Sequence, residues 1–241
     1  MEKEILLIEM WPNRIGKTII DLIGKMHIPY KVKKPYSGEC IPDEYYKGII
    51  ISPGEPNICE LDKYPFLNNV ISFTRHAISK NIPILGICLG HEILAYAAGG
   101  EVSRADGLKA GFIEISHNSN WIFNKIYNPL TVFQYHFNEV VRLPGCAEIL
   151  AESEGCRIQA FKIKDKPCFG IQFHPEISLQ KSIGILIKRK EFLELKRIDT
   201  TEAINLGQKK YNEDQAKAII INYLDRAVLK NDSNVKIKAY G

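Results

Sequence analysis

The chain has 241 residues, of which 45% are hydrophobic and 25% charged, a composition typical of soluble globular proteins. Its 32 basic and 28 acidic residues leave a net charge of +4, which is too small to indicate nucleic acid binding. No apolar run approaches the roughly 20 residues that span a bilayer, and the acidic residues close to Met1 do not fit a secretory signal. We therefore expect a cytoplasmic protein with neither a membrane nor a nucleic acid partner.

In chain order, short apolar runs alternate with stretches of helical periodicity. Strands are predicted at residues 4–9, 29–32, 48–51 and 83–87, and helices at residues 16–26, 66–79 and 92–98. This alternation predicts an α/β fold of the flavodoxin-like type, an open and mostly parallel sheet with helices on both faces.

The second half of the chain has a different pattern. Between residue 101 and about residue 173 we expect shorter strands and denser turns, and a helix is predicted at residues 213–229. We interpret residues 1–187 as one domain and residues 188–241 as a helical extension of it, because so short a segment could hardly bury a large core of its own. The charged run Lys188–Lys190 fits the solvated start of a helix.

The six cysteines form no C-x-x-C pair, so we expect no metal site and no cofactor. Cys88 differs from the others because it lies in the motif Gly86-Ile87-Cys88-Leu89-Gly90, after a predicted strand and before a predicted helix. This is the context of a nucleophile elbow, in which a sharp turn lifts the central side chain above the edge of the sheet. The elbow also places the sulfur at a helix N-terminus, which favours the thiolate, and leaves the Leu89 N–H free to stabilise an oxyanion. A tight turn around a buried cysteine is the alternative interpretation.

A second motif supplies candidate partners for this thiol. The predicted strand that includes Gln172 and Phe173 ends in His174-Pro175-Glu176. A thiol nucleophile needs a base, usually histidine, and the imidazole needs a third group that fixes its tautomer. We predict a catalytic triad of Cys88, His174 and Glu176. His136 is a weaker candidate for the base, and His91 is expected to be packed or exposed.

Together, Gly-Ile-Cys-Leu-Gly-His at residues 86–91 and Gln-Phe-His-Pro-Glu at residues 172–176 resemble the class I, or triad, glutamine amidotransferases. The resemblance covers about residues 4–180, and the nearest members are stand-alone proteins similar to the glutaminase domain of GMP synthase. It implies that Cys88 attacks the side-chain amide of glutamine, giving a γ-glutamyl thioester, glutamate and ammonia. It also implies oxyanion donors at Gly54 and Leu89, and substrate binding around Gln134, Tyr135 and His136.

One position departs from the family pattern. The family usually has glutamine four residues after the nucleophile, where this chain has Glu92. A carboxylate there would repel a substrate carboxylate unless it were protonated or paired, and it could instead favour an ammonium group. A surface glutamate that faces elsewhere is the simpler alternative. Arg104, Asp106 and Lys109 are expected in a glycine-containing surface loop, and a loop that covers the pocket is the alternative.

Three functions remain open on the sequence. The first is a glutaminase that passes ammonia to a separate synthetase, since the chain has no glycine-rich loop for binding ATP phosphates. The second is a free-standing hydrolase of γ-glutamyl peptides or amides with the same triad, which the altered position 92 favours. The third is a catalytically silent binding or regulatory subunit.

Overall fold

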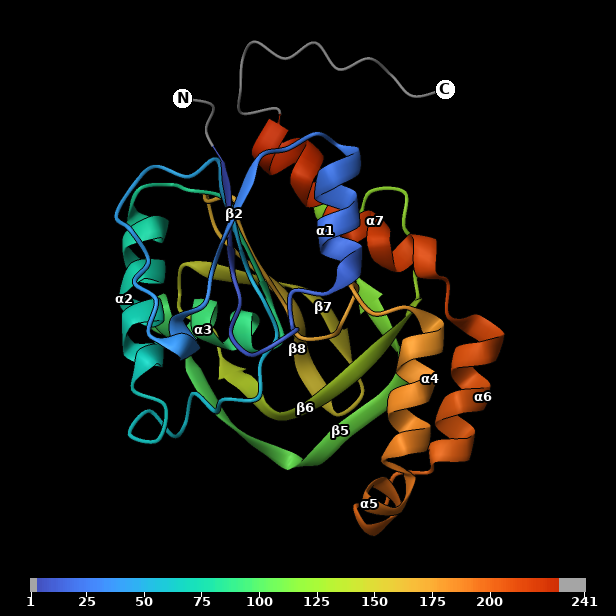
Figure 1. Cartoon of the computed structure of the whole chain (residues 1–241). Coiled ribbons are helices and arrows are strands. Elements are labelled where there is room, and N and C mark those ends of the chain that lie inside the picture. Colours follow the sequence, from blue (N-terminus) through green and yellow to red (C-terminus); the bar gives the residue numbers. More distant parts are fainter. Residues whose placement is uncertain (1–3, 230–241) are drawn as a thin grey trace.

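The computed structural model describes residues 4–229, whose strands form one nine-stranded sheet in the order β2-β1-β3-β4-β9-β8-β7-β5-β6 (Figure 1). The first part of the sheet is parallel and consists of β2 (Tyr30–Lys33), β1 (Ile5–Ile8), β3 (Gly48–Ile51), β4 (Ile84–Ile87) and β9 (Cys168–Ile171). The remaining strands pair antiparallel: β8 (Cys156–Ile163), β7 (Ala147–Ser153), β5 (Glu101–His117) and β6 (Leu130–Arg142). The α/β fold expected from the sequence is confirmed.

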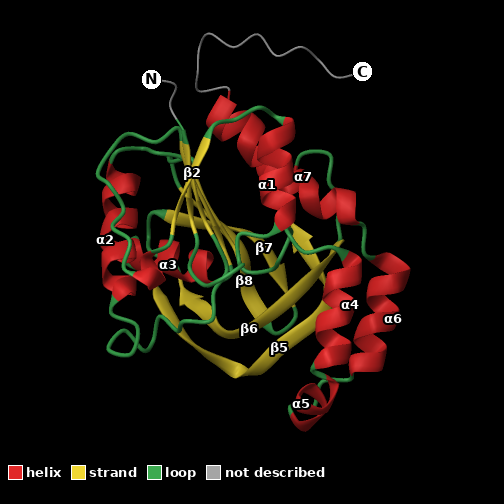
Figure 2. Ribbon diagram, in the orientation of Figure 1, coloured by secondary structure: helices red, strands yellow, loops and turns green. Residues whose placement is uncertain are grey.

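Helices cover both faces of the parallel strands (Figure 2). On one face, Ile5 and Leu7 of β1 pack in a cluster with residues of α1 (Lys17–Lys25) and α7 (Glu213–Tyr223). On the other face, Leu6 and Ile8 pack with α2 (Phe66–Ser79) and α3 (Leu89–Ala97). All four residues of β1 are buried because alternate side chains point into different clusters.

The antiparallel region differs from its prediction. β5 has 17 residues and β6 has 13, so the expectation of short strands between residues 101 and 173 is wrong. Arg104, Asp106 and Lys109 belong to β5, where the pairing with β6 shifts register between Arg104 and Lys109. This irregular stretch resembles a loop in its sequence because it contains Gly107, which adopts a positive φ of 83°.

The helices that follow the sheet are α4 (Leu179–Lys188), α5 (Lys190–Leu195), α6 (Thr200–Lys210) and α7, which continues as a π-helix over Leu224–Leu229. α4, α5 and α6 pack beside β5 and β6, around a cluster that includes Phe112, Phe133 and Leu186. α7 packs against α1 and the central core. Residues 230–241 of the predicted extension lie outside the described residues.

No helix within residues 4–229 is both long enough and apolar enough to cross a bilayer.

Candidate active site

Cys88 lies at the sharp turn between β4 and α3. Its backbone angles, φ 53° and ψ −105°, are unfavourable for a residue with a side chain. The turn closes because Gly86 and Gly90 lack Cβ atoms: a Cβ on Gly86 would lie 2.2 Å from the Gly90 carbonyl oxygen, and one on Gly90 would lie 2.3 Å from that of Ile51. α3 starts at Leu89, three residues earlier than predicted, so Cys88 is its N-cap residue.

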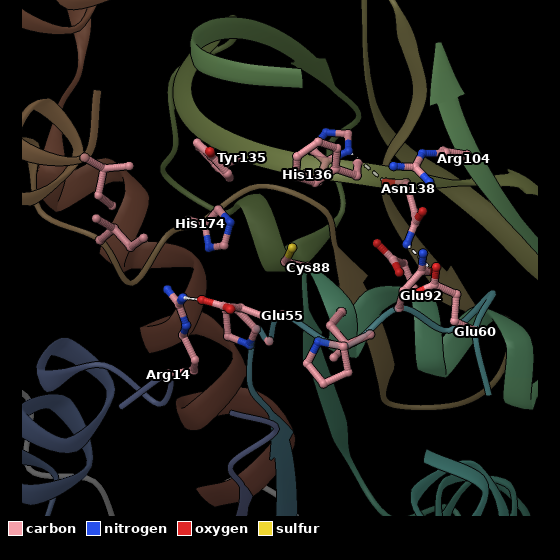
Figure 3. A pocket seen from close by; sticks show the side chains of 18 of the residues that line it. Arg14, Glu55, Glu60, Cys88, Glu92, Arg104, Tyr135, His136, Asn138 and His174 are labelled. Atoms are coloured by element: carbon pink, nitrogen blue, oxygen red, sulfur yellow. Dashed lines mark hydrogen bonds and ion pairs between the residues drawn. The ribbon is translucent and has the colours of Figure 1, made fainter. Parts of the chain in front are cut away.

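His174 and Glu176 follow β9, the parallel neighbour of β4. Because the carboxyl ends of parallel neighbours meet at one edge of a sheet, the thiol and the imidazole lie in the same pocket (Figure 3). The Cys88 N–H donates to the Ile171 carbonyl at 2.8 Å, and the His174 N–H donates to that of Phe133 at 2.9 Å. These bonds hold both residues at the edge of the sheet.

The His174 side chain lies between the thiol and a carboxylate. Its Nδ1 is 2.8 Å from Oε1 of Glu176, and both side chains are buried. Burial alone would lower the pKa of His174, but its interactions with the Glu176 carboxylate and with Cys88 outweigh that effect and raise the pKa above its usual value. The imidazole is therefore a ready proton acceptor beside the sulfur, with its other nitrogen fixed by the carboxylate.

The loop after β3 lies against the first turn of α3. A Cβ on Gly54 would lie 2.7 Å from Cδ2 of Leu89, so the two predicted oxyanion positions are adjacent. The Ser52 hydroxyl holds this loop, accepting from the Met10 N–H at 3.0 Å and donating to the Pro53 carbonyl at 2.8 Å. The Leu89 amide, as a first-turn N–H, has no carbonyl partner within its helix.

Glu92 faces the pocket and is only 3% exposed, so it is not a surface glutamate. Burial raises its pKa to about 7, against the opposing effect of the Asn138 and Gln172 side-chain amides. Asn138 in turn donates to Oδ1 of Asn57 at 2.8 Å, which joins β6 to the loop after β3. Figure 3 places Glu92 and Asn138 on one side of Cys88, together with Arg104.

Of the three predicted substrate-binding residues on β6, two line the pocket and one does not. Tyr135 and His136 line the pocket. Gln134 is not part of the lining, and its Oε1 instead accepts from Nε2 of Gln159 at 3.1 Å and lies 3.2 Å from Nε2 of His136. Burial lowers the pKa of His136 to about 4, so its ring is neutral at pH 7. His91 is fully buried and packs against Phe161, with ring centroids 5.0 Å apart.

The cavity around Cys88 has a volume of about 490 Å³. Sequence reasoning missed several of the residues that line it: Arg14, Asn57, Glu60, Phe137, Ile177, Ile185 and Arg189. Arg14 pairs with Glu55 at the pocket. The sequence predicts only a solvated charge run at Arg189, because nothing local indicates that the junction between α4 and α5 faces a pocket.

A family model for "glutamine amidotransferase class-I" matches residues 13–193. The chain belongs to this family. Among curated proteins, a subunit of the glutamine-hydrolysing GMP synthase of Methanococcus maripaludis strain C5 is 37% identical over 151 residues, covering 62% of this chain and 75% of that protein. The corresponding subunit of Thermococcus kodakarensis is 38% identical over 133 residues, covering 55% and 67%.

Solved structures of glutamine amidotransferases have the same fold. One from Thermotoga maritima superposes with a TM-score of 0.81 at 27% identity, covering 95% of this chain and 99% of that one. Another, from Methylobacillus flagellatus, gives a TM-score of 0.71 at 17% identity and covers 94% of this chain and 95% of that one. The family match ends within α5, so α6 and α7 lie beyond it.

Proposed function

We propose that the chain hydrolyses the side-chain amide of glutamine, with Cys88 as nucleophile, His174 as general base and acid, and Glu176 as the group that orients His174. The observation that carries this proposal is the pairing of a strained, pocket-facing thiol with an imidazole whose Nδ1 lies 2.8 Å from a buried carboxylate. Membership of the class I amidotransferases supports it.

The proposed reaction has two halves. Sγ of Cys88 gives its proton to His174 and attacks the amide carbon, and the backbone N–H groups of Gly54 and Leu89 stabilise the tetrahedral oxyanion. His174 then protonates the leaving ammonia, which leaves a γ-glutamyl thioester. A water molecule, activated by the same imidazole, hydrolyses the thioester to glutamate and regenerates the thiol.

We further propose that the ammonia passes to a synthetase on a separate polypeptide, in the cytoplasm. The curated relatives are each named as one subunit of a glutamine-hydrolysing GMP synthase, which supports an arrangement of two polypeptides. The substrate would be held by Glu92, Tyr135 and His136 in the pocket, and by Gln134 only through its backbone.

One observation favours a second candidate function, a free-standing hydrolase of γ-glutamyl amides or peptides. Glu92 is a buried carboxyl group that faces the pocket, where the family usually has an amide. A carboxylate and an amide differ in charge and in hydrogen-bond donors, so this exchange alters recognition of the amino-acid end of the substrate without affecting the thiol chemistry.

The test of the proposed function replaces the nucleophile. Cys88→Ala should abolish glutamate release from glutamine and from γ-glutamyl dipeptides, and Cys88→Ser should reduce it by at least about a thousandfold. Cys40→Ala, which removes an exposed thiol, is the matched control and should retain full activity. A glutamine-mimicking electrophile should label Cys88 before the other five cysteines.

Retention of wild-type activity by Cys88→Ser would contradict the assignment. An unreactive Cys88 together with no turnover of any γ-glutamyl compound would instead favour a catalytically silent subunit.

A further inference from the structure

The pocket continues past His174, on the side away from Glu92. Figure 3 shows Cys88 between two groups of side chains, with Glu92 and its neighbours on one side and His174 and Tyr135 on the other. Three further side chains line the same cavity: Ile177 from the segment after β9, Ile185 from α4, and Arg189, the residue that caps the C-terminus of α4.

The reaction places the departing amine on the His174 side of the pocket. A general acid must lie next to the nitrogen that it protonates, so the departing amine faces His174. Ammonia, which is about the size of a water molecule, needs only about 30 Å³. The whole cavity, with the side of Glu92 included, measures about 490 Å³, and its lining continues beyond His174 to Ile177, Ile185 and Arg189. A larger amine would therefore meet a lined wall beside the acid that protonates it.

The lining on this side has a defined chemistry. Ile177 and Ile185 are apolar, and Tyr135 adds an aromatic ring. The guanidinium of Arg189 lies over that ring, with Cζ 5.6 Å from the ring centroid, and its Nη1 is 3.4 Å from the Tyr135 hydroxyl, to which it donates. No carboxylate within residues 4–229 pairs with Arg189, so its remaining N–H donors are available to an anion.

We propose that Tyr135, Ile177, Ile185 and Arg189 form a leaving-group subsite. The site then hydrolyses γ-glutamyl amides whose amine carries an apolar side chain and a carboxylate, the chemistry of a γ-glutamyl dipeptide. Glutamine is the smallest member of this substrate class, with ammonia as its leaving group. The inference rests on the proposed function, since it uses the same nucleophile and the same acid.

The bond changes are those of amide hydrolysis. Sγ of Cys88 forms a bond to the γ-carbonyl carbon, the carbon–nitrogen bond breaks, and the amine leaves with a proton from His174. Water then adds to the thioester carbon and gives one proton to His174, the carbon–sulfur bond breaks to release glutamate, and His174 returns the proton to Sγ of Cys88. The products are glutamate and a free amino acid, whose carboxylate Arg189 binds.

The experiment compares three substrates of the purified full-length chain by glutamate release. These are γ-glutamyl-phenylalanine, γ-glutamyl-phenethylamide, which has the same ring and no carboxylate, and glutamine. We expect kcat/KM for the dipeptide to exceed that for the phenethylamide by about tenfold, the size of one charge-assisted hydrogen bond. Arg189→Gln should reduce this ratio to near one. Lys188→Gln, which removes the adjacent exposed lysine of α4, is the control and should preserve the ratio.

Equal rates on the dipeptide and the phenethylamide would overturn the subsite, and so would an unchanged ratio in Arg189→Gln. Hydrolysis of glutamine without hydrolysis of the dipeptide would overturn the subsite and leave the proposed function intact. No turnover of any of the three would remove the proposed function, and the subsite with it.

Discussion

At the residue scale, Glu92 is a buried carboxyl group that lines the pocket. Burial raises its pKa from 4.5 to about 7, so the folded chain holds this proton more tightly than the unfolded chain does. The stability contributed by the neutral carboxyl is therefore fully present below about pH 4.5 and is lost as the pH rises through about 7. At neutral and higher pH, a charged Glu92 destabilises the fold.

The raised pKa of Glu92 gives a prediction for Glu92→Gln, a variant that keeps the shape of the side chain and cannot ionise. The melting temperature of the variant should exceed that of the wild type at pH 8 and should be close to it at pH 4.5. One pKa unit corresponds to about 1.4 kcal/mol, which limits the gain in the free energy of unfolding to about 3 kcal/mol. Thermal melts across this pH range make the measurement.

Glu148→Gln, which removes an exposed carboxylate, is the control for this series and should show no such trend. An equal rise in melting temperature at pH 4.5 and at pH 8 for Glu92→Gln would contradict the prediction, because the stabilisation would then not depend on the ionisation of Glu92.

At the element scale, the elbow depends on close approach between backbone segments. α3 begins directly after Cys88, and Gly86 and Gly90 let the end of β4, the start of α3 and the end of β3 come together. The same packing that buries α3 against the sheet holds Cys88 in its unfavourable backbone conformation. The strain is therefore maintained by the whole βα unit.

Gly86→Ala should test this dependence. Its Cβ would lie 2.2 Å from the Gly90 carbonyl oxygen, which belongs to the backbone and not to the end of a flexible side chain. We expect a loss of about 3 kcal/mol or more in the free energy of unfolding, measured by urea denaturation, together with loss of activity. Gly24→Ala in α1 meets no atom within 4 Å and should instead stabilise the chain by up to about 1 kcal/mol. A stable and fully active Gly86→Ala would show that the elbow tolerates a side chain.

At the scale of the whole molecule, the C-terminal helices are joined to the first half of the chain. Tyr223 at the end of α7 is fully buried, and its hydroxyl donates to the Ile49 carbonyl at 2.9 Å and accepts from the Ile49 N–H at 3.3 Å. Ile219 and Ile220 of α7 pack in the same cluster as β1 and α1. These contacts support the proposal that the segment after residue 187 extends the amidotransferase domain.

Tyr223→Phe should therefore destabilise the entire chain. The ring remains and the Ile49 N–H keeps its shorter hydrogen bond to the Pro83 carbonyl, at 2.8 Å, but the Ile49 carbonyl loses the hydroxyl donor. We expect a cost of about 1 kcal/mol in the free energy of unfolding. Tyr127→Phe, at a side chain that is 68% exposed, is the control and should change little. A single cooperative transition shifted to lower urea concentration is the expected result. An early, separate transition would indicate that α7 unfolds independently.

The sequence by itself determined the local elements of the parallel half. The helix predicted at residues 66–79 is α2, and the strands predicted at residues 48–51 and 83–87 are β3 and β4 within one residue. Periodicity and glycine spacing are local properties, so they identify these elements and the elbow at Cys88 without knowledge of the fold. The proposed triad could be predicted for the same reason, because its three members lie in two short motifs.

Only the tertiary structure decided what surrounds the thiol. The sequence did not predict the length of β5 and β6. The pairing of these strands shifts register near Gly107, and the sequence of that stretch is typical of a loop. The burial of Glu92 depends on β6 and β9 packing over α3, and the position of Arg189 at the pocket depends on how α4 lies against β6. A side chain's exposure and charge state are set by neighbours distant in the sequence, and no local pattern records them.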